Sequence, residues 1–459
     1  MDWVLGCVLV YIVAQLGIAF WFSRRNRSEV DYLLAGRSLG PWLATFTVFA
    51  TWFGAESCVG AAGEAYAHGI SGVIADPFGY SAGIVLSGLL FAGALWKRGI
   101  VTLADLFRER YGIGVERLAA IIMIPGSIMW AAAQVRAFGQ VLASASDLGL
   151  LAAITLAAAV VIAYTAIGGM WADAVTDLVQ GIVLIAGVLA LGAVFVSLGG
   201  LREIAALPAA SFAPMHGRSI VDALDTLAVP IFSTIAAQEL VSRILAVRGA
   251  RLARRATVAA GALYLAIAIV PVAIGLGAAG FIGAGRDHEQ VLALFAAQRL
   301  ALPLYILFLG ALVSAILSTL SGALLVAGSL AAHNVLLPLA PRLPEKAKLR
   351  ANRWAVIAFG VIAYFIALSS QSMYALVQQS SGLGSAGILI MMLFALWGGR
   401  VGGTASAYAA LIAGTSVFVL ADSVLELEGA YLLALGAALA GYLACAPLAS
   451  SMMRRRSSR

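Results

Sequence analysis

Charged residues are scarce in this chain of 459 residues, because Asp, Glu, Lys and Arg together make up only 11% of it. Soluble proteins carry about a quarter of such residues. Hydrophobic residues account for 62% of the chain, and its mean hydropathy is +0.98. This composition excludes a water-soluble enzyme, a nucleic-acid-binding domain and a disordered scaffold. It predicts an all-α polytopic membrane protein.

Cysteine and histidine are also rare, with three and four residues respectively. All three cysteines lie in apolar stretches, so neither a disulfide framework nor a thiolate metal site is supported. No two histidines stand four residues apart, which argues against a zinc enzyme. We therefore expect a protein that is not an enzyme.

Runs of about 20 apolar residues, the length that crosses a bilayer as a helix, recur along the chain. The first run, 3–22, has its basic residues after it rather than before it, which is typical of a membrane span and not of a cleaved signal peptide. About thirteen spans are predicted by this pattern, at 3–22, 41–66, 72–96, 116–142, 149–167, 173–198, 220–245, 256–283, 302–335, 353–369, 373–397, 403–421 and 429–449.

Most of the 29 Lys and Arg residues fall on one side of the membrane if the N-terminus is outside. The positive-inside rule then places the C-terminus in the cytoplasm. The net charge of +7 is therefore explained by basic residues on the cytoplasmic side, where they contact anionic lipid head groups. No nucleic-acid partner is expected. Arginine far outnumbers lysine, as in arginine-biased bacterial genomes, so we expect a multi-pass protein of the cell (inner) membrane. Short polar insertions predict a single transmembrane domain over 1–459, with no obligate protein partner evident.

The second predicted span carries polar residues that are costly to bury in a bilayer. Small or hydroxyl-bearing residues stand at Thr51, Gly54 and Ser57, and Glu56 adds a carboxylate. A helix unwound near Gly54 would offer carbonyl oxygens to a hard cation such as Na⁺. Close helix packing is the alternative explanation for the small residues.

Two further segments are rich in polar side chains. The ninth span places three serines at the spacing i, i+4, i+7 on one helix face: Ser314, Ser318 and Ser321. They can supply oxygen ligands, or they can bond back to carbonyls of their own helix. Before the sixth span, a Gly-Gly pair at 168–169 leads to two acids, Asp173 and Asp177. These acids suit either a binding site or a helix N-terminus.

Aromatic residues lie within or close to the candidate core, at Trp52, Tyr80 and Trp130. Several aromatic faces together can enclose an organic cation by cation–π attraction. Each ring alone is more often a packing residue or an interface anchor. Other polar side chains within predicted spans are Arg136, Gln238 and Glu239, for which a structural Glu–Arg pair is the alternative.

Four blocks of the sequence resemble the sodium:solute symporter family. Residues 164–172 (Tyr-Thr-x-x-Gly-Gly-Met-x-Ala) match that family's signature before its sixth span, and 176–180 (Thr-Asp-x-x-Gln) resemble the block that follows. Residues 31–40 resemble the entry to its second span, and 318–321 resemble its ion-site helix. The blocks stand in the family's order along nearly the whole chain.

This resemblance implies the leucine-transporter-type fold, in which two inverted five-helix repeats rock around a site at the bilayer midplane. The repeats would be 41–198 and 220–397, with an extra N-terminal helix at 3–22 and extra C-terminal helices at 403–449. Na⁺ would be the coupling ion.

The resemblance also implies a principal sodium site between the second and ninth spans. Its matching positions are the backbone carbonyls of Ala50, Phe53 and Ala315 and the side chains of Ser318 and Thr319. Some members of the family hold a second sodium, for which the matching residues are Asp177 and Ser321. Gly322 stands where a further serine often occurs, so this chain departs from the pattern there.

Within the family, blocks at 50–52, 79–81, 101–103 and 130–133 resemble the high-affinity choline transporters. Trp52, Tyr80 and Trp130 match positions of their aromatic cage. Ala237 stands where those transporters carry a further cage tryptophan, and Ser321 stands where they carry an acid. The candidate substrate-binding set is therefore Trp52, Glu56, Tyr80, Trp130 and Gln238.

These observations predict a sodium-coupled secondary symporter that imports a small organic solute by alternating access. The aromatic faces and Glu56 favour an organic cation such as choline. The alternative is a neutral or zwitterionic solute such as proline, because Arg136 offers a partner for a carboxylate. A sensor that binds solute without transporting it is the other class that the sequence leaves open.

Overall fold

The computed structural model describes residues 2–144, 146, 148–370, 377 and 382–446. Within these ranges the chain is helical, with one isolated bridge between Leu39 and Val247 and no strand. The helices of the first half are α1 (Asp2–Ser23), α2 (Glu29–Leu34), α3 (Pro41–Trp52), α4 (Ala61–His68), α5 (Tyr80–Leu86), α6 (Ala92–Arg98), α7 (Leu103–Tyr111), α8 (Ile113–Ser144), α9 (Leu150–Ser197) and α10 (Gly200–Ala205).

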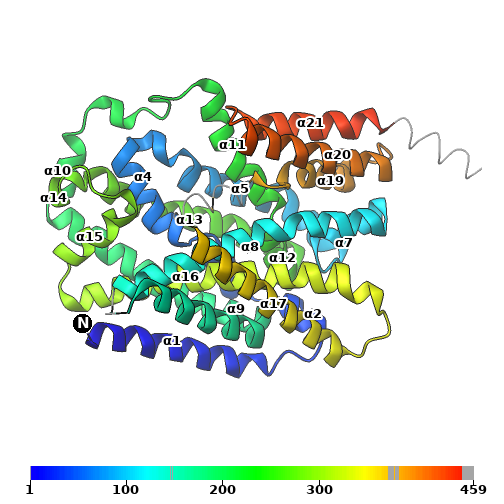
Figure 1. The fold of residues 1–459 in the computed structure, drawn as a ribbon, viewed down its shortest axis with the longest axis horizontal. Helices are drawn as coiled ribbons and strands as arrows, with labels where there is room; N and C mark the ends of the chain where they lie inside the picture. Colours follow the sequence, from blue (N-terminus) through cyan, green and yellow to red (C-terminus); the bar gives the residue numbers. More distant parts are fainter. Residues whose placement is uncertain (1, 145, 147, 371–376, 378–381, 447–459) are drawn as a thin grey trace, which may run out of the picture.

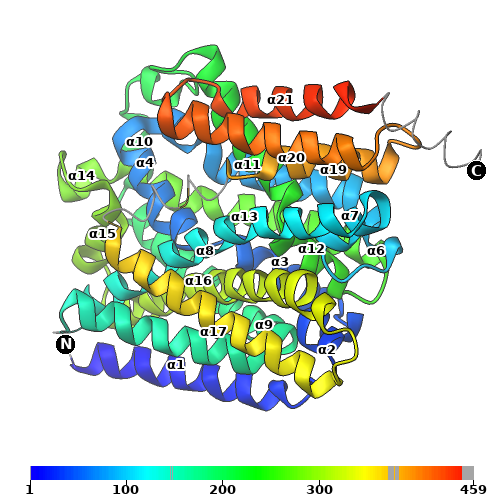
Figure 2. The same ribbon diagram turned by 45° about the vertical axis from the view of Figure 1, so that its right-hand side comes forward.

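The helices of the second half are α11 (Ile220–Ala236), α12 (Gln238–Ala246), α13 (Ala250–Gly277), α14 (Ala279–Ile282), α15 (Val291–Arg299), α16 (Leu302–Ser329), α17 (Glu345–Ser369), α19 (Ser385–Trp397), α20 (Thr404–Phe418) and α21 (Ala430–Ala444). Figures 1 and 2 show a bundle with α1 along one edge, α20 and α21 along the opposite edge, and α8, α9 and α16 between them. The described chain starts and ends at opposite ends of this bundle (Figure 2).

Eight of the described helical stretches are long and apolar enough to cross a membrane, or nine if the bent pair α11–α12 is one span. Leu150–Ser197 covers both the fifth and the sixth predicted spans, and Glu56–Arg98 covers parts of the second and third. The predicted spans 373–397 and 429–449 lie partly outside the described residues. The all-helical membrane fold is confirmed, whereas the count of thirteen and the repeat boundaries stay predictions.

The second predicted span is broken at midlength. α3 ends at Trp52, and Phe53 has the non-helical dihedrals φ −87° and ψ 75°. A short π-helical segment, η2 (Glu56–Gly60), then leads into α4. The break therefore lies beside Gly54, where the small and polar residues indicated it.

The seventh predicted span is also broken, at a position without glycine. α11 ends at Ala236, Ala237 is extended at φ −72° and ψ 127°, and α12 leaves at an angle of 42°. A third break separates the two halves of α9 at Gly169, whose φ of 61° is unfavourable for other residues. A Cβ atom at Gly169 would lie 2.6 Å from the ring of Tyr32, so only glycine fits there.

Helix α16 lies at the centre of the bundle and packs against α3, α8, α9 and α17. Every residue from Ala311 to Ser329 on it is buried. Small residues fill much of this stretch, and they let neighbouring backbones approach closely, as in other membrane helices. The serines of α16 are thereby held in the interior beside the break after α3.

Candidate substrate pocket and ion region

A cavity of about 90 Å³ lies where the breaks of α3 and α11–α12 come together. Its walls come from α3, α5, α8, both sides of the α11–α12 break, and α19. The lining residues are Trp52, Tyr80, Met123, Gly126, Ser127, Trp130, Ser233, Thr234, Ala236, Ala237, Gln238, Glu239, Leu383, Ser385 and Ile388. We call this cavity the pocket. Four of the five predicted substrate-binding residues line it, and Glu56 does not.

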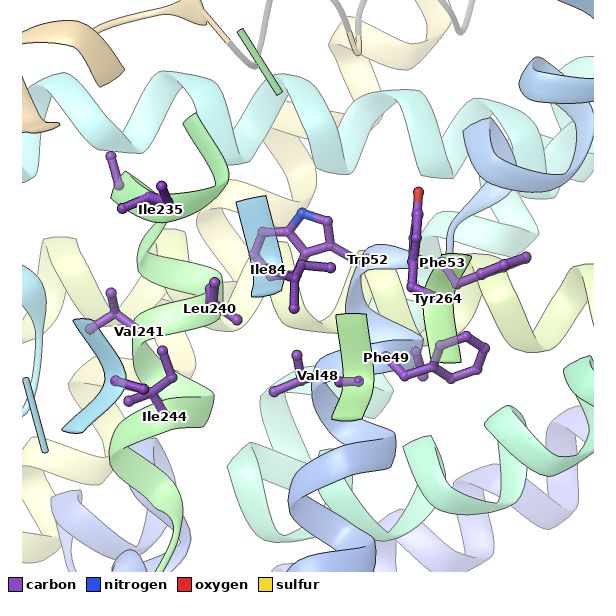
Figure 3. Close-up of a cluster of buried hydrophobic side chains, with 14 of the residues drawn as sticks. Val48, Phe49, Trp52, Phe53, Ile84, Ile235, Leu240, Val241, Ile244 and Tyr264 are labelled. Carbon is purple, nitrogen blue, oxygen red and sulfur yellow. The ribbon is translucent and has the colours of Figure 1, made fainter. Parts of the chain in front are cut away.

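Two tryptophans form one wall of the pocket. The ring centroids of Trp52 and Trp130 are 5.7 Å apart, with an interplanar angle of 63°. The indole Nε1 of Trp52 donates a hydrogen bond of 3.1 Å to Oγ1 of Thr234 in the last turn of α11. Figure 3 shows Trp52 on the side of α3 that faces Ile235 and Leu240, with Phe49 and Phe53 next to Tyr264 on another side. Trp52 thus connects α3 to the α11–α12 segment.

Glu56 lies behind this wall. Its carboxylate accepts hydrogen bonds from Nε1 of Trp130 at 3.3 Å and from Nε2 of Gln134 at 2.7 Å. The carboxylate also folds back over Gly54, where a Cβ atom would lie only 2.5 Å from Oε2. Glu56 therefore orients Trp130 and covers the unwound segment. The sequence predicted that Glu56 binds substrate directly, but its side chain does not line the pocket.

Helix α12 supplies two polar side chains to the pocket, from Gln238 and Glu239. Gln238 is 2% exposed, and its Oε1 accepts a hydrogen bond of 2.6 Å from the backbone N–H of Leu103. Glu239 is also buried, and its Oε1 accepts a hydrogen bond of 2.6 Å from the hydroxyl of Ser127. The sequence marked Glu239 as a buried polar residue, but its place in the pocket depends on the direction of α12 and was not predicted.

The predicted sodium-site residues lie between α3 and α16. The hydroxyl of Thr319 donates a 3.4 Å hydrogen bond to the carbonyl of Ala50. Ala315 is one turn before Thr319 on α16, and it is fully buried, as are Ser318 and Phe53. The structure thus brings the end of α3 and the middle of α16 into contact at the predicted positions.

Two buried acids of α9 join the same region. Asp177 accepts hydrogen bonds from Ser318, at 2.5 Å, and from Thr47. Asp173 accepts a hydrogen bond from Ser321 and forms a salt bridge of 2.7 Å with Arg243. Ser321 therefore meets Asp173 rather than Asp177. We call the set Thr47, Asp173, Asp177, Arg243, Ser318 and Ser321 the ion region.

Arg243 stands near the end of the seventh predicted span, 220–245. The structure places its side chain in the interior, with 0% exposed, because α12 continues past it to Ala246. A Cβ atom at position 322 would lie 2.6 Å from Nη2 of Arg243. The glycine that stands there, where the family often has a serine, therefore leaves room for the guanidinium. Arg136, in contrast, does not line the pocket and donates a 3.4 Å hydrogen bond to the carbonyl of Ala367.

Comparison with known proteins identifies the family. The model of the sodium:solute symporter family matches residues 32–414. A high-affinity choline transporter of Caenorhabditis elegans is 28% identical over 402 residues, which cover 80% of this chain and 69% of that protein. The human high-affinity choline transporter is 27% identical over 417 residues, covering 82% and 69%. The choline-transporter likeness seen in the sequence is therefore confirmed.

Solved structures share the fold. A Na⁺-coupled sialic acid symporter in a substrate-bound, outward-open state superposes with a TM-score of 0.85 at 19% identity, covering 96% of this chain and 97% of that one. The transporter MhsT in complex with L-phenylalanine gives a TM-score of 0.56 at 14% identity, covering 90% and 99%. The predicted leucine-transporter-type fold is confirmed. With a family match over more than half of its residues, the chain belongs to the sodium:solute symporter family.

Proposed function

We propose that this protein is a sodium-driven symporter that imports a small organic cation of about the size of choline by alternating access. The observation that carries the proposal is the pocket between the breaks of α3 and α11–α12, with the rings of Trp52, Tyr80 and Trp130 in its walls. Aromatic faces attract a cation most strongly where water is excluded. Among the described residues that line the pocket, no Lys, Arg or His is present to oppose a positive charge.

We assign the principal sodium site to the carbonyls of Ala50, Phe53 and Ala315 and the hydroxyls of Ser318 and Thr319. Carbonyls freed at a broken helix are suited to Na⁺. Because Ser318 donates its proton to Asp177, its lone pairs are left to accept a cation. We leave the second sodium that the resemblance implies at Asp177 and Ser321 unassigned, because Ser321 bonds to Asp173, which is already paired with Arg243.

Coupling follows from the position of this site between α3 and α16. A sodium ion bound to both helices stabilises the conformation in which the end of α3, and with it Trp52, is held at the pocket. Substrate binds that conformation more tightly, so each ligand raises the affinity for the other by the same factor. The inward Na⁺ gradient then drives accumulation of the solute.

The alternative substrates differ in charge. A zwitterion such as proline needs a partner for its carboxylate, and the residue considered for that role, Arg136, lies outside the pocket. The pocket therefore favours the cation. A sensor that binds the solute without moving it would show binding but no accumulation.

Uptake into proteoliposomes tests the proposal. Labelled choline is measured with and without an inward Na⁺ gradient, beside labelled proline and beside liposomes without protein. Sodium-driven choline accumulation is the expected result. Accumulation of proline alone would keep sodium symport and overturn the cation assignment, and binding of choline without accumulation would favour the sensor.

A further inference from the structure

Glu239 gives the pocket a feature that an aromatic cage lacks. Its side chain is 5% exposed, and it is the one Asp or Glu among the described residues that line the pocket. Ala237, two residues earlier, stands where the choline transporters that this chain resembles carry a further cage tryptophan. This wall of the pocket therefore offers a carboxylate where an aromatic face is expected.

Among the described residues that line the pocket, none is basic, so no cationic side chain there pairs with the carboxylate of Glu239. The nearest basic residue along the helix, Arg243, sends its Nη2 to Asp173 at 2.7 Å and reaches Glu239 only at the backbone carbonyl, at 3.2 Å from Nη1. Ser127 supplies a neutral hydroxyl to Oε1 of the carboxylate. A cationic ligand would thus supply the missing opposite charge.

The break between α11 and α12 brings helix ends of opposite sign to the pocket. The N-terminus of α12 stabilises the carboxylate of Glu239 in its first turn, and the C-terminus of α11 adds carbonyl acceptors. Ser233, Thr234 and Ala236 line the pocket from the last turn of α11, whose final carbonyls carry the partial negative charge of a helix C-terminus. Trp52 is the last residue of α3, so a second C-terminus faces the same space. Carbonyl and carboxylate oxygens accept hydrogen bonds, and an aromatic face does not replace them for an N–H donor.

The chemistry of the bound cation follows from these acceptors. A quaternary ammonium has no N–H group, and its methyl groups would hold the carboxylate of Glu239 away from the charge. A protonated amine can donate directly to Glu239 while its carbon chain packs on the two tryptophans. A charge-assisted hydrogen bond of this kind is shorter and stronger than one between neutral groups.

We propose that Glu239 is a specificity-determining residue, which makes the pocket prefer a small protonated amine bearing N–H groups over a quaternary ammonium of the same skeleton. This inference rests on the proposed function, since it narrows the class of organic cation that the same pocket takes. Choline itself then becomes a weaker ligand than its unmethylated counterpart, ethanolamine.

A methylation series tests the inference. Ethanolamine, N-methylethanolamine, N,N-dimethylethanolamine and choline are compared with the purified protein in detergent, by ligand-induced shift of the unfolding temperature at fixed Na⁺. The same four compounds are then compared in sodium-driven uptake. We expect the apparent affinity to fall with each methyl group, by about 10- to 100-fold from the first compound to the last.

Substitution of the carboxylate separates its charge from its packing. Glu239→Gln is expected to remove the preference by weakening ethanolamine about 10- to 100-fold while changing choline by less than about threefold, and Glu239→Asp is expected to retain the order of the series. Glu203→Gln on α10, an exposed acid, is the matched control and leaves the series unchanged.

The outcomes distinguish this inference from the proposed function. A flat or inverted series in a protein that accumulates choline with Na⁺ would overturn the role of Glu239 and keep the symporter. An equal loss of all four compounds in Glu239→Gln would likewise overturn it, because it would show a structural role through Ser127. A graded series in binding without uptake would support Glu239 and count against transport, and no response to any compound would overturn both.

Discussion

The ion region and the pocket are two buried polar sites beside the same broken helix, and they are built differently. In the ion region, hydroxyls, carboxylates and a guanidinium bond directly to one another, as in the Ser318–Asp177 and Arg243–Asp173 contacts. In the pocket, aromatic rings, hydroxyls and a single carboxylate surround a space of about 90 Å³. One site is filled by paired charges, and the other keeps room for a solute.

This difference teaches what a mutation at each site should change. Removing one member of a buried charge pair leaves its partner without compensation, so the cost falls on folding. Removing a side chain that borders a cavity mainly removes contacts to the ligand, so the cost falls on affinity. The two sites are connected, because Arg243 of the ion region stands on α12, whose first turn lines the pocket.

The largest effect is expected where the charge pairing is broken. Arg243→Gln leaves Asp173 buried without its cation and should lower the free energy of unfolding by about 3–5 kcal/mol. Thermal unfolding in detergent measures the loss. Asp173→Asn in the Arg243→Gln background removes the uncompensated charge and should restore most of the stability. Equal instability of the single and double variants would show that packing, and not charge, holds this region together.

The pocket should respond in the opposite way. Trp52→Ala removes an aromatic face that meets the cation, and it should raise the substrate KM by about 30- to 100-fold. The Na⁺ concentration for half-maximal uptake should change by less than about threefold, since its ligands are oxygens. Trp42→Ala on the same helix, where the indole is 72% exposed, is the matched control. Comparable losses for substrate and sodium would mean that Trp52 serves packing alone.

Much of the fold could be predicted from the sequence, because bilayer crossing needs long apolar helices and breaks in them need special residues. The interruption beside Gly54 and the Gly169 break both follow from small or polar residues within apolar runs. The break at Ala237 did not, since alanine favours helix and neither glycine nor proline stands there. Tertiary contacts, such as the hydrogen bond from Trp52 on α3 to Thr234 just before that break, cannot be read from the sequence.

The sites were predicted less completely, because the sequence does not show which neighbouring element each side chain points toward. The serine spacing on α16 was visible, but Ser314 bonds back to the carbonyl of Gly310 whereas Ser318 reaches Asp177. The burial of Arg243 could not be read from the sequence, because it depends on how α12 packs in the interior. Glu239 reaches the pocket because of the 42° bend before it.

A smaller effect is expected from one hydroxyl of the ion region. Ser318→Ala removes a proposed sodium ligand and should raise the Na⁺ concentration for half-maximal uptake about tenfold. This change corresponds to the loss of one contact to a charge with the strength of a hydrogen bond. The substrate KM at saturating Na⁺ should stay near its original value. Ser314→Ala, one turn earlier, is the matched control, because that hydroxyl bonds to the carbonyl of Gly310 and to the hydroxyl of Tyr11 on α1, away from the ion region. Unchanged sodium dependence in Ser318→Ala would refute the assignment of this site.

The smallest effect is expected at Arg136, which belongs to neither site. Its guanidinium donates to the carbonyl of Ala367 at 3.4 Å, away from the residues that line the pocket. Arg136→Gln should therefore change the substrate KM and the Na⁺ dependence by less than about twofold, while unfolding becomes easier because the guanidinium loses its contacts inside the protein. Uptake kinetics and thermal unfolding of the same preparation separate these effects. A tenfold rise in KM would instead show that the guanidinium of Arg136 contacts the substrate. Because a guanidinium repels a cation and attracts a carboxylate, that result would favour a carboxylate-bearing solute as the substrate.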